Sequence, residues 1–557
     1  MLYLTELQAQ RSNLGFTPDL PCVIIFSGMV NPASLLRSPT KIGHFERLRV
    51  CPLVMVMNKC FVENNNDVSG PVFSDDSVAR EMELLDTSTQ IHQWQSPTGE
   101  IFHLELPHTV YPPREDTDFM AKNLLRLGPG KGRKCLEIGV GSGVLSLFCH
   151  RQGWKVSACD INPYAIAAAR EFFRCNSGSE IKLSEGGPGP KDDGRLEQWS
   201  GSIDYDLIFW NIPYIKPATQ NFQHLGPLED AALIDTSEQS LVAITLEKIK
   251  SANMLKPSGV GLFTIGETYS EEQINSWCAT NGFASRITNR LNFEDGECLR
   301  ILAFWHPFAK ATHTHKEVVG STNSELLTKD WPVGTSISAD YQTAGRGRYS
   351  REWTNSAELM ACSWKIANQH EITPEILQIL CGYIVKESFE SADSPFSDCK
   401  ALLKWPNDLI LVKKSYWGKV CGILVESVSK GKDNQIVIGI GINISNGGIE
   451  SDTKFPIGFA EWYSKNITKE FLFNQIHCRL AGMFENVNGI PKLNFDNIKQ
   501  YVFDAVRHGF LQAKSLFYRN SPVSLDSIND DVSVNLIAHD KQVITCYESE
   551  DLTWLFL

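Results

Sequence analysis

Two short motifs in the second half of the chain combine residue types that suit phosphate chemistry. Residues 345–353 read GRGRYSREW, and residues 404–409 read KWPNDL. Glycines leave backbone amides exposed on a segment that can bend, and each arginine can bind phosphate oxygens through its planar guanidinium group. Such a loop would wrap an anionic phosphate and screen a reactive anhydride from water. The sequence therefore predicts a site that holds an acyl-adenylate.

Two more motifs follow in the same half of the chain, GKVCGILVE at 418–426 and IVIGIGINIS at 436–445. The order of the four motifs resembles the biotin–protein ligases of the BirA type, and the resemblance runs from about His315 to the end. It implies an α+β ligase catalytic domain that uses ATP, Mg²⁺ and biotin. Lipoate ligases share that fold but lack the pairing of KWPND with GRGR, so they are the weaker alternative.

The resemblance also implies a role for individual residues. The ureido end of biotin would be bound by Ser321, Thr322, Asn323 and Gln342. The phosphates would be neutralised by Arg346, Arg348 and Lys419, beside the glycines Gly345, Gly347 and Gly422. The nucleotide would contact Trp405, Asn407 and Asn443, and Asp408 would hold magnesium through oxygen. Tyr349 and Ser350 stand where an Arg-Gly pair is usual, which predicts altered ordering of the loop.

The first half of the chain carries a different signature, in which Glu137, Gly139, Gly141 and Gly143 form an E-x-G-x-G-x-G turn. Between a strand and a helix, these glycines let the backbone approach a nucleotide-like ligand at the helix N-terminus. Asp160 ends the next predicted strand, where a ribose hydroxyl pair would lie. The pattern permits a dinucleotide or S-adenosylmethionine, and tight strand–helix packing alone is the alternative.

Residues 211–214, which read NIPY, favour methyl transfer over the other options. They end a predicted parallel strand, so they should face the glycine turn across the ligand crevice. The Asn211 side-chain carbonyl and the Ile212 backbone carbonyl can accept both hydrogens of a planar NH₂ group. Tyr214 can stack over that group, with Pro213 between them. Positioning of this kind is the main contribution that methyl transfer requires.

This half resembles the HemK-like amino-methyltransferases, which methylate the glutamine of a Gly-Gly-Gln loop in peptide-release factors. The matching motifs are YPPREDTD at 111–118, CLEIGVGSG at 135–143, CDINPYAI at 159–166 and NIPY. Ile212 replaces the first proline of the usual Asn-Pro-Pro-Tyr motif. The resemblance implies S-adenosylmethionine as cofactor and a release factor as substrate. Two alternatives stay open: a nucleic-acid amine as methyl acceptor, and a non-catalytic module that binds the cofactor or recruits an acceptor protein.

Strands and helices alternate from 134 to 306, which predicts the doubly wound sheet of a class I methyltransferase. Short strands near the end predict a small β-barrel, and 185–194 reads as a turn-rich surface loop. His313 and His315 fit a solvated linker better than a metal pair. The predicted segments are an uncharacterised region 1–90, a methyltransferase-like domain 91–307, a linker 308–316, a ligase domain 317–515 and a β-barrel 516–557.

Composition narrows the classes of function. The formal net charge is −13, and the 15 cysteines include no C-x-x-C pair, so a zinc ribbon and a thioredoxin site have no support. The start lacks the layout of a signal peptide, and the apolar runs are too short to span a bilayer. We therefore expect a cytoplasmic protein that is not bound to a membrane. The acidic balance argues against specific DNA binding. The expected partners are the biotin carboxyl-carrier domain of a carboxylase and a peptide-release factor.

Overall fold

The computed structural model describes residues 89–556 except 179, 189–198, 201–203, 215–234, 236–239, 295, 349–357, 368–371, 393–397, 415, 431–432 and 447–454. The uncharacterised region 1–90 therefore lies almost wholly outside the described residues, as do Tyr349 and Ser350. The chain divides into two compact units. The first holds the described residues within 1–125, 129–203 and 209–248, and the second holds those within 126–128, 204–208 and 249–557.

The described part begins with an antiparallel hairpin of β1 (Gln90–Gln95) and β2 (Ile101–Leu106). Trp94, Phe102 and Leu104 are buried on one face, because side chains alternate between the two faces of a strand. Helix α5 (Glu115–Arg126) follows, and the Trp94 indole donates a hydrogen bond to Asp118 at its start (2.7 Å).

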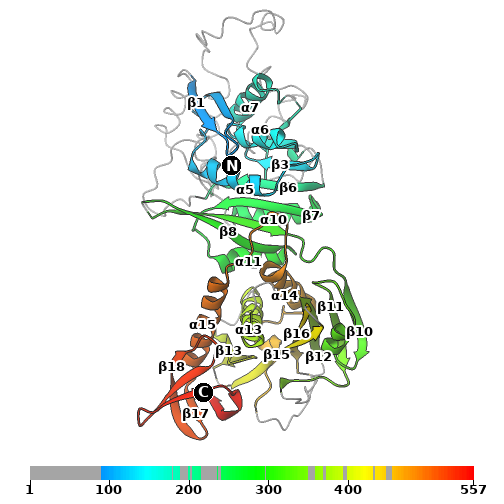
Figure 1. Ribbon diagram of the computed structural model, residues 1–557, viewed down its shortest axis with the longest axis vertical. Helices are drawn as coiled ribbons and strands as arrows, with labels where there is room; N and C mark the ends of the chain where they lie inside the picture. The colour runs from blue at the N-terminus through cyan, green and yellow to red at the C-terminus, as the bar shows by residue number, and fades with distance from the viewer. Residues whose placement is uncertain are drawn as a thin grey trace, which may run out of the picture. The chain divides into compact units, whose positions relative to one another are not determined.

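The predicted alternation of strands and helices forms a seven-stranded sheet with the order β5-β4-β3-β6-β7-β9-β8 (Figure 1). Its elements are β3 (Lys134–Ile138), α6 (Val144–Arg151), β4 (Lys155–Asp160), α7 (Pro163–Cys175), β5 (Lys182–Glu185), β6 (Tyr205–Asn211), α10 (Leu241–Ser251), β7 (Leu255–Ile265), α11 (Glu271–Thr280), β8 (Ala284–Asn292) and β9 (Cys298–Trp305). Strands β3, β4 and β5 are parallel, whereas β9 is antiparallel to β7 and β8.

The strand order places the first candidate site. From β3 the chain crosses to β4 on one side and later to β6 on the other. In an open sheet of this kind, the crevice at the carboxyl ends of the strands where the order reverses is the usual ligand site. The carboxyl ends of β3, β4 and β6 carry the glycine turn, Asp160 and NIPY, respectively.

The ligase-like half contains a second seven-stranded sheet with the order β10-β11-β12-β16-β15-β14-β13. Its elements are β10 (His313–Val319), α12 (Thr322–Thr328), β11 (Ser336–Gln342), β12 (Glu358–Ile366), α13 (Pro374–Glu390), β13 (Cys399–Lys404), β14 (Asp408–Lys413), β15 (Tyr416–Lys430), β16 (Asp433–Ser445), η3 (Ala460–Trp462), α14 (Lys469–Phe484) and α15 (Phe495–Gln512). All its strand pairs are antiparallel except β10 with β11. Helix α13 packs on β13, β14 and β15, as Figure 1 shows.

The predicted linker at 308–316 is shorter in the structure. Residues 313–316 belong to β10, which pairs in parallel with β11 at the edge of the second sheet. His313 and His315 lie within hydrogen-bonding distance of Ser336 and Ser338 on β11 (2.9 and 3.0 Å). The interpretation of these histidines as part of a solvated linker is therefore wrong. A polar strand at a sheet edge keeps its side chains in water, and its sequence resembles that of a linker.

The chain ends in a five-stranded antiparallel sheet with the order β20-β19-β18-β17-β21. Its elements are β17 (Ser515–Tyr518), β18 (Ser521–Ile528), β19 (Val534–Ala538), β20 (Val543–Cys546), η4 (Ser549–Asp551) and β21 (Leu552–Leu555). The short strands predicted here are confirmed, whereas closure into a barrel stays a prediction.

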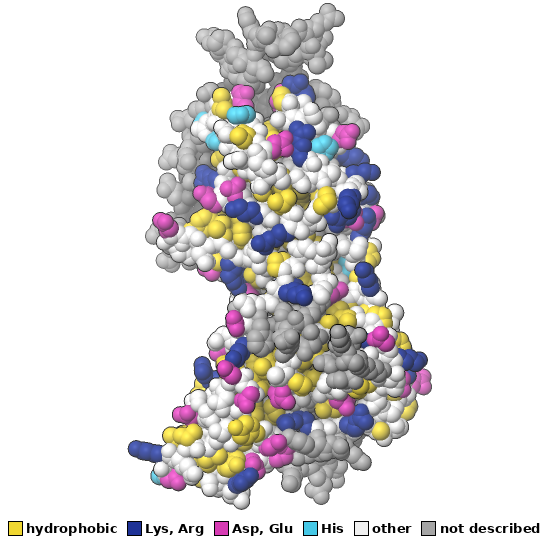
Figure 2. Space-filling view, in the orientation of Figure 1, with side chains coloured by type: hydrophobic (Ala, Val, Ile, Leu, Met, Phe, Trp, Pro, Cys, Tyr) yellow, Lys and Arg dark blue, Asp and Glu magenta, His cyan; other side chains and the backbone are white. Residues whose placement is uncertain are grey.

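The described part of the chain carries charged side chains of both signs on its surface and cysteines that are mostly buried. Lys and Arg side chains are interspersed with Asp and Glu side chains across the visible described face (Figure 2). The described cysteines are all free thiols, and all except Cys175 are buried. Within the described residues, every helix is too short or too polar to cross a bilayer.

Candidate functional sites

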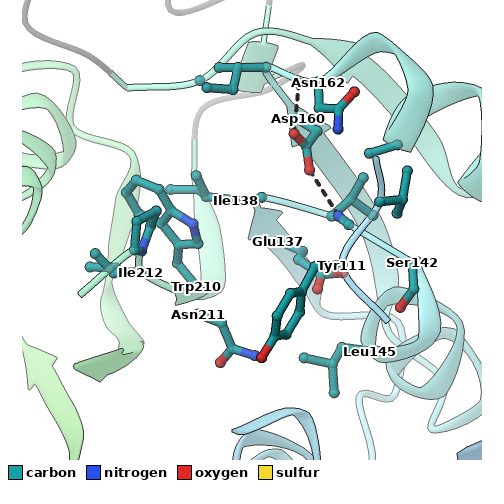
Figure 3. A pocket seen from close by; sticks show the side chains of 18 of the residues that line it. Tyr111, Glu137, Ile138, Ser142, Leu145, Asp160, Asn162, Trp210, Asn211 and Ile212 are labelled. Carbon is teal, nitrogen blue, oxygen red and sulfur yellow. Dashed lines mark hydrogen bonds between the residues drawn. The ribbon is translucent and has the colours of Figure 1, made fainter. Parts of the chain in front are cut away.

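The first site is a cavity that gathers the motifs of the methyltransferase-like half. It is lined by the turn after β3, by Asp160 at the end of β4, and by all four residues of NIPY, which begins at the last residue of β6. Figure 3 shows Asp160, Asn211 and Ile212 around this cavity. Gly139 and Gly141 have φ angles of 68° and 48°, a conformation that costs glycine little. The structure therefore brings together residues that the sequence separates by 70 positions or more.

Two carboxyl groups line this cavity, those of Glu137 and Asp160. Glu137 is buried and accepts a hydrogen bond from Ser146; burial raises its pKa to about 8, with a smaller contribution from Asp160. Burial also raises the pKa of Asp160 to about 6, although its carboxylate accepts hydrogen bonds from the backbone amides of Gly141 and Asn162 (both 2.8 Å). Both shifts arise because a buried carboxylate lacks hydration, and a cationic ligand such as a sulfonium would relieve that cost.

The part of the cavity formed by the end of β6 and NIPY contains two apolar side chains among the polar ones. Ile212 is buried, and so is Trp210, whose indole lies against the glycine turn. A Cβ atom on Gly139 would approach the Trp210 Nε1 to 2.6 Å, so only glycine fits there beside this indole. Asn211 and Tyr214 line the same cavity, as predicted for residues that would bind a planar amide.

Gly143 has a role in packing. It precedes α6 with a φ angle of 83°, and it is not among the residues that line the cavity. A Cβ atom there would approach the Phe173 ring to 2.9 Å. The close contact of helix α7 with this turn therefore depends on the absence of a side chain.

Several cavity residues were missed by sequence reasoning. Tyr111 and Asp116 belong to the motif YPPREDTD, and burial raises the pKa of Asp116. Residues 186–188 also line the cavity, although we interpreted 185–194 as a surface loop with no further role. Their position directly after the parallel strand β5 was the signal that could have identified them.

The second site is a cavity of about 890 Å³ in the ligase-like half, within the usual size range of small-molecule sites. Its lining includes most of the residues that the resemblance selects. These are Ser321, Thr322, Asn323, Gln342, Arg346, Gly347, Arg348, Asn407, Asp408, Lys419 and Gly422.

A hydrogen-bonded network organises the side of this cavity where biotin is expected. The Gln342 carbonyl oxygen accepts hydrogen bonds from the backbone amide (2.9 Å) and the hydroxyl (3.1 Å) of Thr322. Ser363, a buried residue of β12 that the sequence did not reveal, donates to Asn323 Oδ1 (2.5 Å) and lies 2.7 Å from the Thr322 hydroxyl. Gly439 is required beside Asn323, because a Cβ atom there would approach Asn323 Oδ1 to 2.3 Å.

The phosphate side of the cavity is built around a buried carboxylate and two lysines. Asp408 lies 2.7 Å from Lys419 Nζ and 3.3 Å from Lys404 Nζ. Burial alone would raise the pKa of Asp408, but the two ammonium groups hold it below its usual value. Two ammonium groups at these distances already balance the charge of this carboxylate, which does not fit a side chain that holds magnesium by itself. The role of Asp408 in binding magnesium stays a prediction.

Three predicted residues are not among those that line this cavity, namely Gly345, Trp405 and Asn443. The buried Trp405 donates its indole N–H to the carbonyl of Val532 (3.0 Å), so it connects KWPND to the C-terminal sheet. Asn443 donates to the carbonyl of Lys419 (3.4 Å), behind the phosphate side. These contacts show both residues supporting the site, and direct contact with the nucleotide stays a prediction.

The C-terminal sheet contributes a wall that the motifs did not indicate. Residues 549, 550 and 552–555 line the cavity, and Glu548 lies 4.0 Å from Arg348. Lys404 and Trp417 were also missed as lining residues. No motif marks this wall, because residues about 150 positions from KWPND reach it only through the fold.

Comparison with known proteins agrees with the division into halves. Residues 305–443 match the biotin/lipoate A/B protein ligase family. The first half is 28% identical over 209 residues to a Methanocaldococcus jannaschii protein named "Putative protein N5-glutamine methyltransferase", covering 36% of this chain and 94% of that relative. One part of the chain thus matches the biotin/lipoate A/B protein ligase family, and another part is similar to a methyltransferase. The predicted fusion is thereby confirmed.

Several other relatives are biotin–protein ligases. The chain is 36% identical over 141 residues to the bifunctional ligase/repressor BirA of Salmonella typhimurium, covering 24% of this chain and 41% of that relative. A biotin protein ligase from Aquifex aeolicus, solved with biotin and ATP, aligns over 44% of this chain and 99% of its own at 21% identity, with a TM-score of 0.35. The chain thus spans less than half of its BirA relative.

Proposed function

We propose that the second half attaches biotin to a lysine of an acceptor protein in two steps. The biotin carboxylate attacks the α-phosphate of ATP, which forms biotinyl-AMP and releases pyrophosphate. The lysine amine then attacks the carbonyl carbon of the mixed anhydride, and AMP leaves. The observation that supports this proposal is the single cavity in which neutral polar groups, two loop arginines and Lys419 meet.

The residues divide between binding and charge compensation. Arg348 and Lys419 would stabilise the negative charge that develops on the phosphate, because fixed cations act strongly where water is partly excluded. Ser321, Thr322 and Gln342 would orient the ureido group of biotin. Magnesium would accompany the phosphates of ATP. The acceptor we propose is the biotin carboxyl-carrier domain of a carboxylase, which fits the Mycobacterium tuberculosis relative named "Biotin--[acetyl-CoA-carboxylase] ligase".

The test uses the full chain with labelled biotin, ATP, magnesium and a purified carrier domain. We expect label on one lysine of the carrier domain and release of pyrophosphate. A carrier domain whose acceptor lysine is replaced by arginine is the control. Absence of pyrophosphate release in the presence of biotin would exclude the proposal.

We also propose that the first half is an S-adenosylmethionine-dependent methyltransferase that acts on an amide or amino nitrogen. The supporting observation is that Glu137, Asp160 and NIPY line one cavity at the switch point of the sheet. Bound S-adenosylmethionine would supply the methyl group. Asn211 and the Ile212 carbonyl would orient the acceptor NH₂, and the buried carboxyl groups would face the cationic cofactor. The glutamine of a release factor is the substrate that the similarity favours.

Ile212 supports the alternative that this half binds the cofactor without turnover, since it replaces a proline that fixes the backbone. The test is labelled S-adenosylmethionine with a release factor, and separately with nucleic acid. Label on the release-factor glutamine supports the first proposal, and label on nucleic acid supports the other acceptor. Cofactor binding without label on either supports the non-catalytic module. We further propose cytoplasmic localisation and closure of the C-terminal sheet into a small β-barrel, in keeping with the free thiols and the short strands.

A further inference from the structure

Glu426 lies on β15, next to the second cavity, and is not among the residues that line it. Its side chain is 27% exposed and contacts two residues that do line the cavity. One carboxylate oxygen accepts a hydrogen bond from Asn323 Nδ2 (2.7 Å) and the other from Arg346 Nη2 (3.2 Å). Glu426 therefore connects the biotin side with the arginine loop.

Both partners of Glu426 are held by other groups as well. Asn323 accepts from Ser363 and is close to the Leu424 carbonyl, so its amide has a fixed orientation. Arg346 also donates to the hydroxyl of Ser324 (2.9 Å). Arg346 is 43% exposed and lines the cavity, so its guanidinium can reach a bound anion. The fixed end of the contact is thus the biotin side, and the movable end is Arg346.

We propose that Glu426 is a positioning residue of the adenylate-forming reaction, which holds Arg346 at the cavity and competes with nucleotide phosphates for it. This inference rests on the proposed ligase function. A triphosphate carries more negative charge than a carboxylate and offers oxygens for two parallel guanidinium bonds, so it displaces Glu426 from Arg346. Because Asn323 still binds Glu426 after the exchange, the carboxylate stays in place and recovers Arg346 when the nucleotide leaves.

The variant Glu426→Gln tests this competition, because it keeps the size of the side chain and an oxygen for Asn323 but removes the charge. We expect the KM for ATP to fall about two- to fivefold, the change that corresponds to loss of a partly exposed ion pair. The KM for biotin should change by less than twofold. Glu426→Asp, which keeps the charge, should restore the KM for ATP toward the wild-type value. A KM for ATP that stays constant or rises in Glu426→Gln overturns the proposal.

Combining Glu426→Gln with Arg346→Gln shows whether Glu426 changes the KM for ATP through Arg346. If Glu426 acts through Arg346, adding Glu426→Gln to the Arg346→Gln background leaves the KM for ATP unchanged. An equal shift in both backgrounds would mean that Glu426 acts on the phosphates directly, and would overturn the proposal. Glu325→Gln is the matched control, because Glu325 forms an exposed ion pair with Lys316 (2.8 Å) and is not a lining residue of the cavity.

A measurement of nucleotide binding without turnover separates this inference from the proposed function. Titration calorimetry with α,β-methylene-ATP and biotin measures affinity without turnover. If wild-type protein binds the analogue but forms no biotinyl-AMP, the proposed function fails while the Glu426 comparison stays valid. Tighter analogue binding by Glu426→Gln then supports the competition, and equal or weaker binding rejects it. Thermal unfolding of each variant confirms that the comparison is between folded proteins.

Discussion

Cationic side chains in the second cavity are paired with carboxylates that belong to other segments. Arg346 contacts Glu426, Lys419 contacts Asp408, and Arg348 approaches Glu548 from the C-terminal sheet (4.0 Å). The sequence indicated the cations, because they lie in recognisable motifs. It did not indicate Glu426 or Glu548 as partners, because pairing across the fold leaves no spacing pattern.

Arg348 provides a residue-scale test of the loop. Replacing it by glycine removes a cation from the phosphate side, so we expect the adenylate to escape before the acceptor arrives. Nearby lysines on added serum albumin should then become biotinylated, and the rate of specific transfer should fall by about tenfold or more, which corresponds to about 1.4 kcal/mol. Streptavidin blots of a mixture of carrier domain and albumin give the measurement. Unchanged acceptor selectivity would contradict the assignment of Arg348 to the loop that retains the adenylate.

Asn211 provides the corresponding test in the first cavity. Asn211→Ala removes the side-chain carbonyl that would orient the acceptor, so methyl transfer should fall at least a hundredfold, because positioning accounts for several kcal/mol of such barriers. Binding of S-adenosylmethionine should change little, since Glu137 and Asp160 remain. Cofactor affinity from calorimetry and transfer from labelled methyl groups separate the two effects. Full methyl transfer by the variant would remove Asn211 from the mechanism.

At the scale of elements, the pattern of apolar residues in the sequence predicted most of the first sheet. Strand β6 contains the continuous apolar run LIFW, β3 has three apolar residues among five, and helices alternate with such strands, so their type and order could be predicted. The edge strand β10 could not, because HTHKEVV is mostly exposed and carries no apolar period. The contribution of residues 186–188 to the first cavity was missed because their turn-rich composition indicated a surface loop, although they directly follow the parallel strand β5.

Helix α14 carries a titratable contact with β12. Trp364 donates its indole N–H to His477 Nδ1 (3.1 Å), so that nitrogen must be unprotonated. The pKa of His477 is lowered to about 4, mainly by burial and to a smaller extent by His313, although a hydrogen bond with Pro307 opposes this shift. The unfolded chain then binds more protons than the folded chain between about pH 4 and 6.5, so stability is lost as the pH falls through this window.

We expect the free energy of unfolding of the second unit to fall by about 2 kcal/mol more in the wild type than in His477→Gln between pH 7 and 4.5. Glutamine supplies a carbonyl oxygen for the Trp364 indole and does not titrate. Urea titrations at several pH values, followed by tryptophan fluorescence, give the comparison. Parallel pH profiles of the two proteins would mean that His477 does not control acid stability.

At the scale of the molecule, the motifs predicted two halves of different chemistry, and the division into compact units follows a different boundary. The second unit includes β8 and β9 as well as the ligase-like sheet. Within this unit, Gly482 on α14 lies so close to β8 that a Cβ atom would approach the Ser285 carbonyl oxygen to 2.5 Å. The periodic pattern of apolar residues predicts each helix or strand separately. The contact between β8, which follows the methyltransferase-like motifs, and α14, which follows the ligase-like motifs, therefore could not be predicted.

Arg286 on β8 tests how far this contact stabilises the second unit. It is buried, and its guanidinium donates to the carbonyls of Gly482 (2.9 and 2.7 Å), Pro491 (2.8 Å) and Glu485 (3.1 Å). Burial lowers its pKa to about 10, so it remains charged at neutral pH. Arg286→Met leaves three carbonyls without this donor, and we expect a loss of about 2–4 kcal/mol in the free energy of unfolding.

The matched control for this prediction is Arg290→Met, four residues along the same strand. Arg290 is 44% exposed and pairs with Glu271, so its replacement should cost at most about 1 kcal/mol. Urea unfolding of the full chain, followed by tryptophan fluorescence, ranks the two variants. Equal losses would mean that the carbonyls near the end of α14 gain as much from water as from Arg286, and that the contact between β8 and α14 contributes little to the stability of the unit.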